Sequence, residues 1–171
     1  MSDERRQTRI TLVETLERIP HFDDLEVLEA VKALFVIWKQ PLDVVKLEQQ
    51  KQLEASRDYL SKGGQRQLEE QHKREQKSRE RETIDEALDI IRSWLRDILL
   101  VCLDKADEMV NSDFHFHIEQ LAQRQNEASI ARMLVAVDKA QGRIQYNVSK
   151  ELVMETLFFA LRDELAGNGL V

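Results

Sequence analysis

The sequence predicts an all-α fold, a helical bundle of about six to seven helices. The 171 residues include only five glycines and two prolines, too few for the tight turns of a β-sandwich or barrel. Charged residues make up 33% of the chain and are accompanied by Gln, Leu and Ala, a composition that favours helices. Apolar residues also recur at helical spacing along most of the chain.

The first 60 residues form an N-terminal helical segment with three predicted helices. The first, 3–19, carries apolar residues at helical spacing and ends at Pro20. The second, 24–39, is capped by Asp23 or Asp24, and Pro41 interrupts or kinks it. The third, 42–60, has a sparser apolar pattern. The apolar positions in the three helices are Ile10, Val13, Leu16, then Leu28, Val31, Leu34, Phe35, Trp38, then Val45, Leu53 and Leu60.

Residues 61–83 differ in composition and predict a charged exposed helix or a linker. Their only aliphatic residue is Leu68, and they hold seven basic and five acidic side chains. Mixed signs with helical propensities are typical of a solvated helix, and Gly63-Gly64 predicts a hinge before it. A nucleic-acid contact through these residues is the less favoured alternative, and replacing Lys73, Arg74, Lys77 and Arg79 by Glu would test it.

Residues 84–166 predict a C-terminal helical bundle. From Ile84 to Cys102 two adjacent apolar stripes cover most of a helix, so we expect this helix to be central. A polar connection follows, and then a short helix with Phe114, Ile118 and Leu121. Asn126 opens the next helix, whose narrow stripe runs from Ile130 to Ile144. Ser149 is the expected cap of the last helix, and Gly167-Asn168-Gly169 is its stop signal.

Charge and cysteine content limit the setting in which the chain acts. Its net charge is −7, which disfavours a free-standing nucleic-acid-binding module. The single cysteine cannot form an internal disulfide, residues 1–18 are too charged for a secretion signal, and no apolar run is long enough to cross a bilayer. We therefore expect a cytoplasmic protein with no membrane contact.

The sequence predicts no enzyme, no cofactor and no metal site. Gly63-Gly64 is followed by Gln65-Arg66 and not by the Lys-Ser/Thr of a nucleotide-binding loop. Asp113, His115 and His117 cluster in the sequence, but on a helix the two histidines would point apart and could not share an ion, whereas in an extended loop they could. We favour a polar capping loop with Phe114 and Phe116 packed inward. Cys102 lies on the apolar face of the central helix and predicts a buried, unreactive thiol.

A subunit interface is the remaining candidate for a functional surface. Neighbouring Phe158 and Phe159 cannot both face one direction, so burial inside one bundle and contact with a partner are equally compatible with the pattern. The candidate interface residues are Trp94, Arg96, Phe158 and Phe159.

Two segments resemble the C-terminal region of the bacterial DNA polymerase III delta prime subunit, a clamp-loader family. Arg92-Ser93-Trp94-Leu95-Arg96-Asp97-Ile98-Leu99-Leu100 is similar to the R-x-W/L-x-R-D-ϕ-L-L helix of that family. Ala140 to Leu161, with Asn147-Val148-Ser149 inside, resembles its closing helices. The better match covers residues 80–165, residues 1–79 match more loosely, and the first three helices are longer than a minimal member of the family would show.

The resemblance implies the collar, the helical domain that joins five subunits of the loader of the sliding clamp. Its partners would be the clamp-loader ATPase (gamma/tau) and delta subunits, which act in DNA replication with ATP bound elsewhere in the AAA+ complex. The motifs of an ATPase-like module do not appear in this sequence, so the chain is expected to be the collar portion alone, a fragment of such a subunit. A helical adaptor or regulatory protein that binds another partner through its apolar helices is the alternative.

Overall fold

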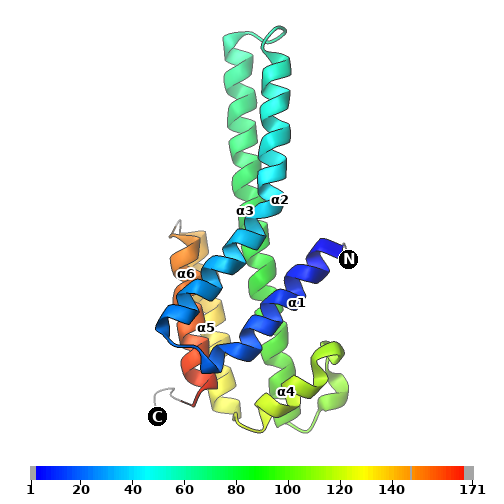
Figure 1. Ribbon diagram of the computed structural model, residues 1–171, viewed down its shortest axis with the longest axis vertical. Helices are drawn as coiled ribbons and strands as arrows, with labels where there is room; N and C mark the ends of the chain where they lie inside the picture. The colour runs from blue at the N-terminus through cyan, green and yellow to red at the C-terminus, as the bar shows by residue number, and fades with distance from the viewer. Residues whose placement is uncertain (1–2, 147, 168–171) are drawn as a thin grey trace.

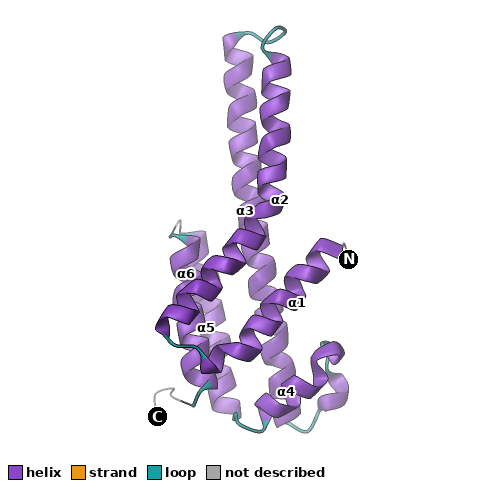
Figure 2. Cartoon of the chain, viewed as in Figure 1, coloured by secondary structure: helices purple, strands orange, loops and turns teal. Residues whose placement is uncertain are grey.

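The chain folds into helices alone across the residues that the structure, a computed structural model, describes: 3–146 and 148–167 (Figure 2). No strand occurs among them, and the predicted all-α class is confirmed. None of these helices is long and apolar enough to cross a membrane. The α-helices are α1 (Asp3–Arg18), α2 (Asp24–Ser56), α3 (Lys62–Cys102), α4 (His115–Ala122), α5 (Glu127–Gln145) and α6 (Lys150–Leu165), with short 3-10 helices at Ile19–His21, Ala106–Glu108 and Ser112–Phe114.

The molecule has two parts, a helical bundle and a long two-helix arm (Figure 1). The helices α2 and α3 run side by side as an antiparallel hairpin. Their halves nearest the other helices belong to the bundle, and the rest projects from it (Figure 1). We call residues 42–83 the arm, because they lie between Trp38, the last buried apolar residue of α2, and Ile84, the first buried apolar residue of α3. Of the other helices, α1, α4 and α5 pack against α3, while α6 packs against α5 and α2.

The predicted helices 24–39 and 42–60 are one continuous helix, so of the two alternatives at Pro41, an interruption or a kink, the interruption is wrong. Proline removes one backbone donor and costs about 3 kcal/mol inside a helix. The helix continues because both flanks are held in place: Trp38 is buried in the bundle, and Gln49 is buried against α3. Figure 1 shows α2 changing direction as it leaves the bundle, as expected for a helix that a proline kinks.

The predicted hinge at Gly63-Gly64 is also wrong. Both glycines lie in the first turn of α3, at the tip of the arm, where the Ser61 hydroxyl accepts a hydrogen bond from the Gly64 amide at 3.2 Å. The charged stretch 61–83 and the central helix from Ile84 onward therefore form a single 41-residue helix. The change in composition occurs within a helix because the helix passes from solvent into the bundle.

The hydrophobic core surrounds the bundle half of α3. Trp94 and Leu95 are fully buried there, and every other helix of the bundle contributes apolar side chains. Burial at about 25 cal/mol per Å² of apolar area makes this core the main source of stability. Its buried members on α3 are Ile84, Ala87, Leu88, Ile91, Trp94, Leu95 and Ile98.

The predicted caps of α2, α5 and α6 are confirmed. Asp23 and Glu26 form a reciprocal capping box, with both hydrogen bonds at 2.8 Å. The Asn126 side chain accepts from the Ser129 amide at 2.9 Å, and the Ser149 hydroxyl accepts from the Leu152 amide at 3.4 Å. Gly167 follows α6 in the left-handed conformation (φ 77°), while Asn168 and Gly169 of the predicted stop signal lie outside the described residues.

Candidate subunit interface

The four candidate interface residues fall into two groups. Trp94 and Phe158 are fully buried inside the bundle, so neither can touch a partner while the chain is folded. Arg96 is exposed on α3, and Phe159 is half-buried on α6 with the Arg162 guanidinium 5.1 Å from its ring centre. Of the four, only Arg96 and Phe159 remain available for the predicted contact, and neither lines the groove described next.

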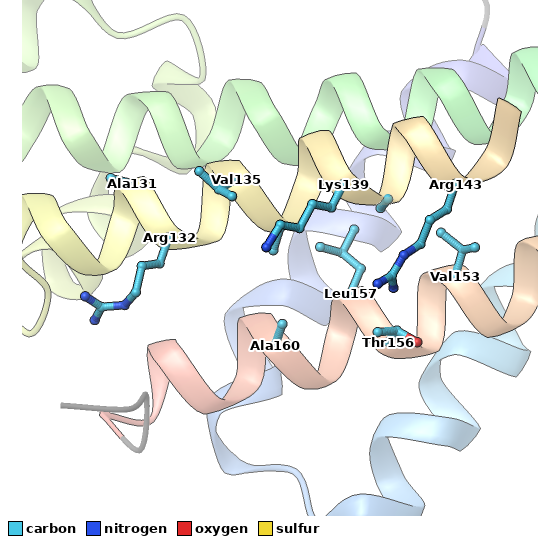
Figure 3. A pocket seen from close by; sticks show the side chains of 11 residues that line it. Ala131, Arg132, Val135, Lys139, Arg143, Val153, Thr156, Leu157 and Ala160 are labelled. Carbon is cyan, nitrogen blue, oxygen red and sulfur yellow. The ribbon is translucent and has the colours of Figure 1, made fainter. Parts of the chain in front are cut away.

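A groove runs along the outer surface between α5 and α6 (Figure 3). It has a volume of about 480 Å³. The two helices are antiparallel, and the alanines that they place between them are too small to fill the space, so the surface remains hollow. Its lining residues are Ala131, Arg132, Val135, Ala136, Lys139, Ala140, Arg143, Val153, Thr156, Leu157 and Ala160.

The rim of the groove is positively charged. Figure 3 shows Arg132, Lys139 and Arg143 extending from α5 toward α6. Arg132 is held by Glu164 of α6 through two hydrogen bonds, at 2.7 and 2.9 Å, and this bond raises its pKa above the ordinary value. The ammonium of Lys139 and the guanidinium of Arg143 have no ion-pair partner among the described residues, so both charges are free to meet an incoming group.

The sequence pattern did not predict this groove. The stripe proposed for α5 runs through Ile130, Met133 and Val137, which do pack into the core. Val135 falls outside that stripe and is 50% exposed. The sequence does contain a signal for the groove. Val135 is an apolar residue on the outer face of an amphipathic helix, and Ala131 and Ala136 lie beside it.

The sequence pattern also did not predict that a buried carboxylate near the C-terminal end of α3 holds the connection that follows this helix. Asp97 has no exposed surface, and its Oδ2 accepts hydrogen bonds from the Val110 amide (3.1 Å), the Asn111 amide (2.7 Å) and the Asn111 side chain (2.7 Å). Asn111 Oδ1 in turn accepts from Arg9 of α1 at 2.6 Å. This chain of contacts fixes the connection after α3 to two helices and explains why an acid can occupy a core position.

Arg9 closes that network at the surface. Its guanidinium binds both oxygens of Asp113, at 2.5 and 2.8 Å, and lies 4.9 Å from the centre of the Phe114 ring. The hydrogen bonds raise the pKa of Arg9 and lower that of Asp113. The connection between α3 and α4 is therefore held by charge-assisted bonds, which are stronger than neutral ones.

The two histidines after this connection lie in α4. His115 Nε2 is 3.1 Å from Glu119, and His117 Nδ1 is 3.3 Å from Glu17 of α1. Among the described residues, no three His, Cys, Asp or Glu side chains are grouped closely enough to hold a metal ion. Phe114 packs against the core as predicted, but Phe116 is 64% exposed, so the prediction that it points inward is wrong. It faces away because α4 begins at His115 and places neighbouring side chains about 100° apart.

The single thiol is less deeply buried than its position on the apolar face predicts. Cys102 is half-buried, with its sulfur 3.7 Å from the Ala122 carbonyl oxygen. Burial raises the pKa of this thiol, which lowers the fraction of reactive thiolate at neutral pH.

On the arm, part of the positive charge is already neutralised by neighbouring residues. Arg79 lies 2.9 Å from Glu75, and Arg74 lies 3.7 Å from Glu70, each one turn earlier on α3. Gln49 of α2 connects to the same region by a hydrogen bond to Glu75 at 2.9 Å and one from Gln76 at 2.7 Å. Two of the four cations considered for nucleic-acid binding are thus paired within the arm.

Comparison with known proteins identifies the family. The model of the family "DNA polymerase III, delta subunit, C terminal" matches residues 47–163. This chain belongs to that family. The family consists of clamp-loader subunits of DNA polymerase III, and the match begins within the arm and continues through α3 to α6. Neither the curated proteins nor the solved structures contain a match to the chain.

Proposed function

We propose that the chain is the oligomerisation (collar) domain of a clamp-loader subunit that resembles delta prime. In this role it supports ATP-driven loading of the sliding clamp in DNA replication without catalysing any step. The observation that carries the collar role is the family match over 47–163, which includes all of α4 and α5 and most of α6. The assignment to delta prime rests on the resemblance of the segments 92–100 and 140–161 to that subunit. The proposed setting is the cytoplasm.

The mechanism is geometric. A domain with a rigid core and an open apolar surface can hold its neighbours in a fixed order, so that ATP sites on those neighbours are completed. The buried network of Asp97, Asn111 and Arg9 supports this role because it fixes α1, α3 and the connection to α4 relative to one another. The groove between α5 and α6 supplies an exposed surface of mixed apolar and basic character.

Size-exclusion chromatography with light scattering tests the proposal. The chain is run alone and then mixed at micromolar concentration with the ATPase (gamma/tau) and delta subunits of its source. Co-elution as one complex is expected, and separate elution would contradict the collar role.

A competition version of the same experiment separates delta prime from delta. A delta-prime-like chain is expected to join the ATPase together with delta. A chain that occupies the position of delta would instead displace delta from the complex when added in excess.

A further inference from the structure

We propose that the groove between α5 and α6 receives an amphipathic helix of a neighbouring clamp-loader subunit, with acidic residues flanking the helix's apolar face. The inference rests on the proposed function for the identity of the partner. The groove's shape, floor and charge each support it.

The length of the groove suits a short helical segment. Its residues on α5 run from Ala131 to Arg143, which corresponds to about 18 Å along the axis, or roughly three turns. Two packed antiparallel helices leave between them a furrow into which the ridge of a third helix fits. The facing stretch of α6, from Val153 to Ala160, keeps the groove open along the same direction.

The floor of the groove favours close helix packing. Four small side chains in the floor leave room for another helix to approach to the 8–10 Å between axes that is typical of packed helices. They are Ala131, Ala136, Ala140 and Ala160. Apolar surface is added by the lining residue Val135, whose side chain is 50% exposed. Covering this surface would remove apolar area from water, which is the main driving force of association.

The charge of the groove selects an acidic occupant. The lining holds three cations and no carboxylate, although the whole chain has a net charge of −7. Glu164 already neutralises Arg132. Lys139 and Arg143 stand at the rim, where carboxylates of an incoming helix would pair with them and steer its approach.

Two other hollows in the described surface differ in character. The one between α1 and α2 has a volume of about 310 Å³ and mixes Arg18 with Glu26 and Glu29, so it selects no sign of charge. The one at the base of the arm is lined by four lysines but has only Leu42 as an apolar lining residue. Of these three hollows, only the α5–α6 groove has both an apolar floor and cationic lining residues with no carboxylate in the lining.

The test is a charge reversal in the full chain, with the ATPase and delta subunits of its source as the binding probe. The double variant Lys139→Glu/Arg143→Glu should bind at least about tenfold more weakly than the parent and lose much of its salt sensitivity. The matched control, Lys51→Glu/Lys62→Glu on the arm, changes the net charge by the same amount and should bind like the parent. All four side chains are exposed, so circular-dichroism melts should agree.

A second measurement locates the contact without altering charge. In a Cys102→Ser background, Val135→Cys labelled with a polarity-sensitive fluorophore should shift its emission to shorter wavelength when the two subunits are added. The same label at Val44→Cys, on the exposed side of the arm, should not respond. Val44 is 58% exposed and thus comparable to Val135 before binding.

The outcomes are distinct. If the parent chain does not join the complex at all, the proposed function is overturned. If the parent joins, but both charge variants bind equally well and the label at residue 135 stays silent, the groove is not the docking site. If the chain alone is a dimer that the groove variant dissociates, the occupant is a second copy and the proposal of an acidic partner helix is overturned.

Discussion

The bundle and the arm share two helices, α2 and α3, yet they are held together in different ways, as α3 shows. Between Ile84 and Ile98 this helix buries eight side chains, seven of them apolar, whereas between Lys62 and Thr83 it buries only His72. On the arm half of α2, the only buried residue is Gln49. The bundle is stabilised by apolar burial, and the arm depends on polar contacts and on ion pairs one helical turn apart.

A continuous helix can therefore differ in stability from one half to the other. Exposed ion pairs one turn apart contribute about 0.3–0.5 kcal/mol each, much less than a buried aliphatic side chain. We therefore expect the arm to open locally while the bundle remains folded.

Replacing Leu95 by Asp should unfold the bundle, because it places an unpaired carboxylate at a fully buried position, at a cost of several kcal/mol. The same change at Leu47, which is 54% exposed on the arm, should shift stability by less than about 0.5 kcal/mol. Thermal melts followed by circular dichroism compare the two variants. Similar melts for Leu95→Asp and the parent would show that α3 is not the centre of the core.

Asp97→Ala should lower the free energy of unfolding by about 1–3 kcal/mol, because it leaves buried donors of Val110 and Asn111 without an acceptor. Urea titration followed by tryptophan fluorescence measures the loss. Asp107→Ala, in the same connection but exposed, serves as the control and should match the parent. Equal midpoints for the two variants would contradict the structural role given to Asp97.

Gln49→Ala should weaken the arm by about 1 kcal/mol and leave the unfolding midpoint of the bundle unchanged. It removes the hydrogen bonds to Glu75 and from Gln76, two of the contacts that join the arm's helices. Hydrogen exchange should quicken at amides of residues 45–80 and not at those of 84–98. Gln52→Ala, an exposed neighbour, is the control, and faster exchange throughout α3 would refute the separation of the two parts.

Glu17→Gln should raise the stability of the bundle at pH 7 by at most about 1 kcal/mol. Burial raises the pKa of Glu17, with a smaller opposing effect from His117, so the folded state favours the protonated form. That contribution is fully present below the unfolded pKa and is lost as pH rises through the folded pKa, so the variant's advantage should vanish in acid. Urea titrations at several pH values measure it, with exposed Glu29→Gln as the control. An advantage for Glu17→Gln that did not depend on pH would rule out this explanation.

Local signals were sufficient to predict most of the bundle. Asn126 and Ser149 mark the starts of α5 and α6 because a capping side chain acts within three residues of itself. The stripe from Ile84 to Ile98 identifies the central helix because only a core requires apolar residues on two adjacent faces.

The remaining features depend on contacts between distant residues. Pro41 is accommodated because Trp38 before it is buried in the bundle and Gln49 after it is hydrogen-bonded to α3, and no local rule reports these distant contacts. The partners of Asp97 come from residues 110 and 111, across a connection whose path the sequence does not specify. Trp94 and Phe158 were equally compatible with core and interface until the packing of α3 and α6 placed both inside.

The unbroken passage of α2 and α3 from bundle to arm makes the arm a lever. From Ile84 to the tip of α3 there are 22 residues, or about 33 Å of helix. A tilt of the bundle by about 10° would therefore carry the tip through roughly 6 Å. The glycines of the arm lie at its far end, and both of its helices cross the junction without a break, so the arm follows the bundle through such a rotation. A small reorientation of the bundle within an assembly would be amplified at the tip of the arm.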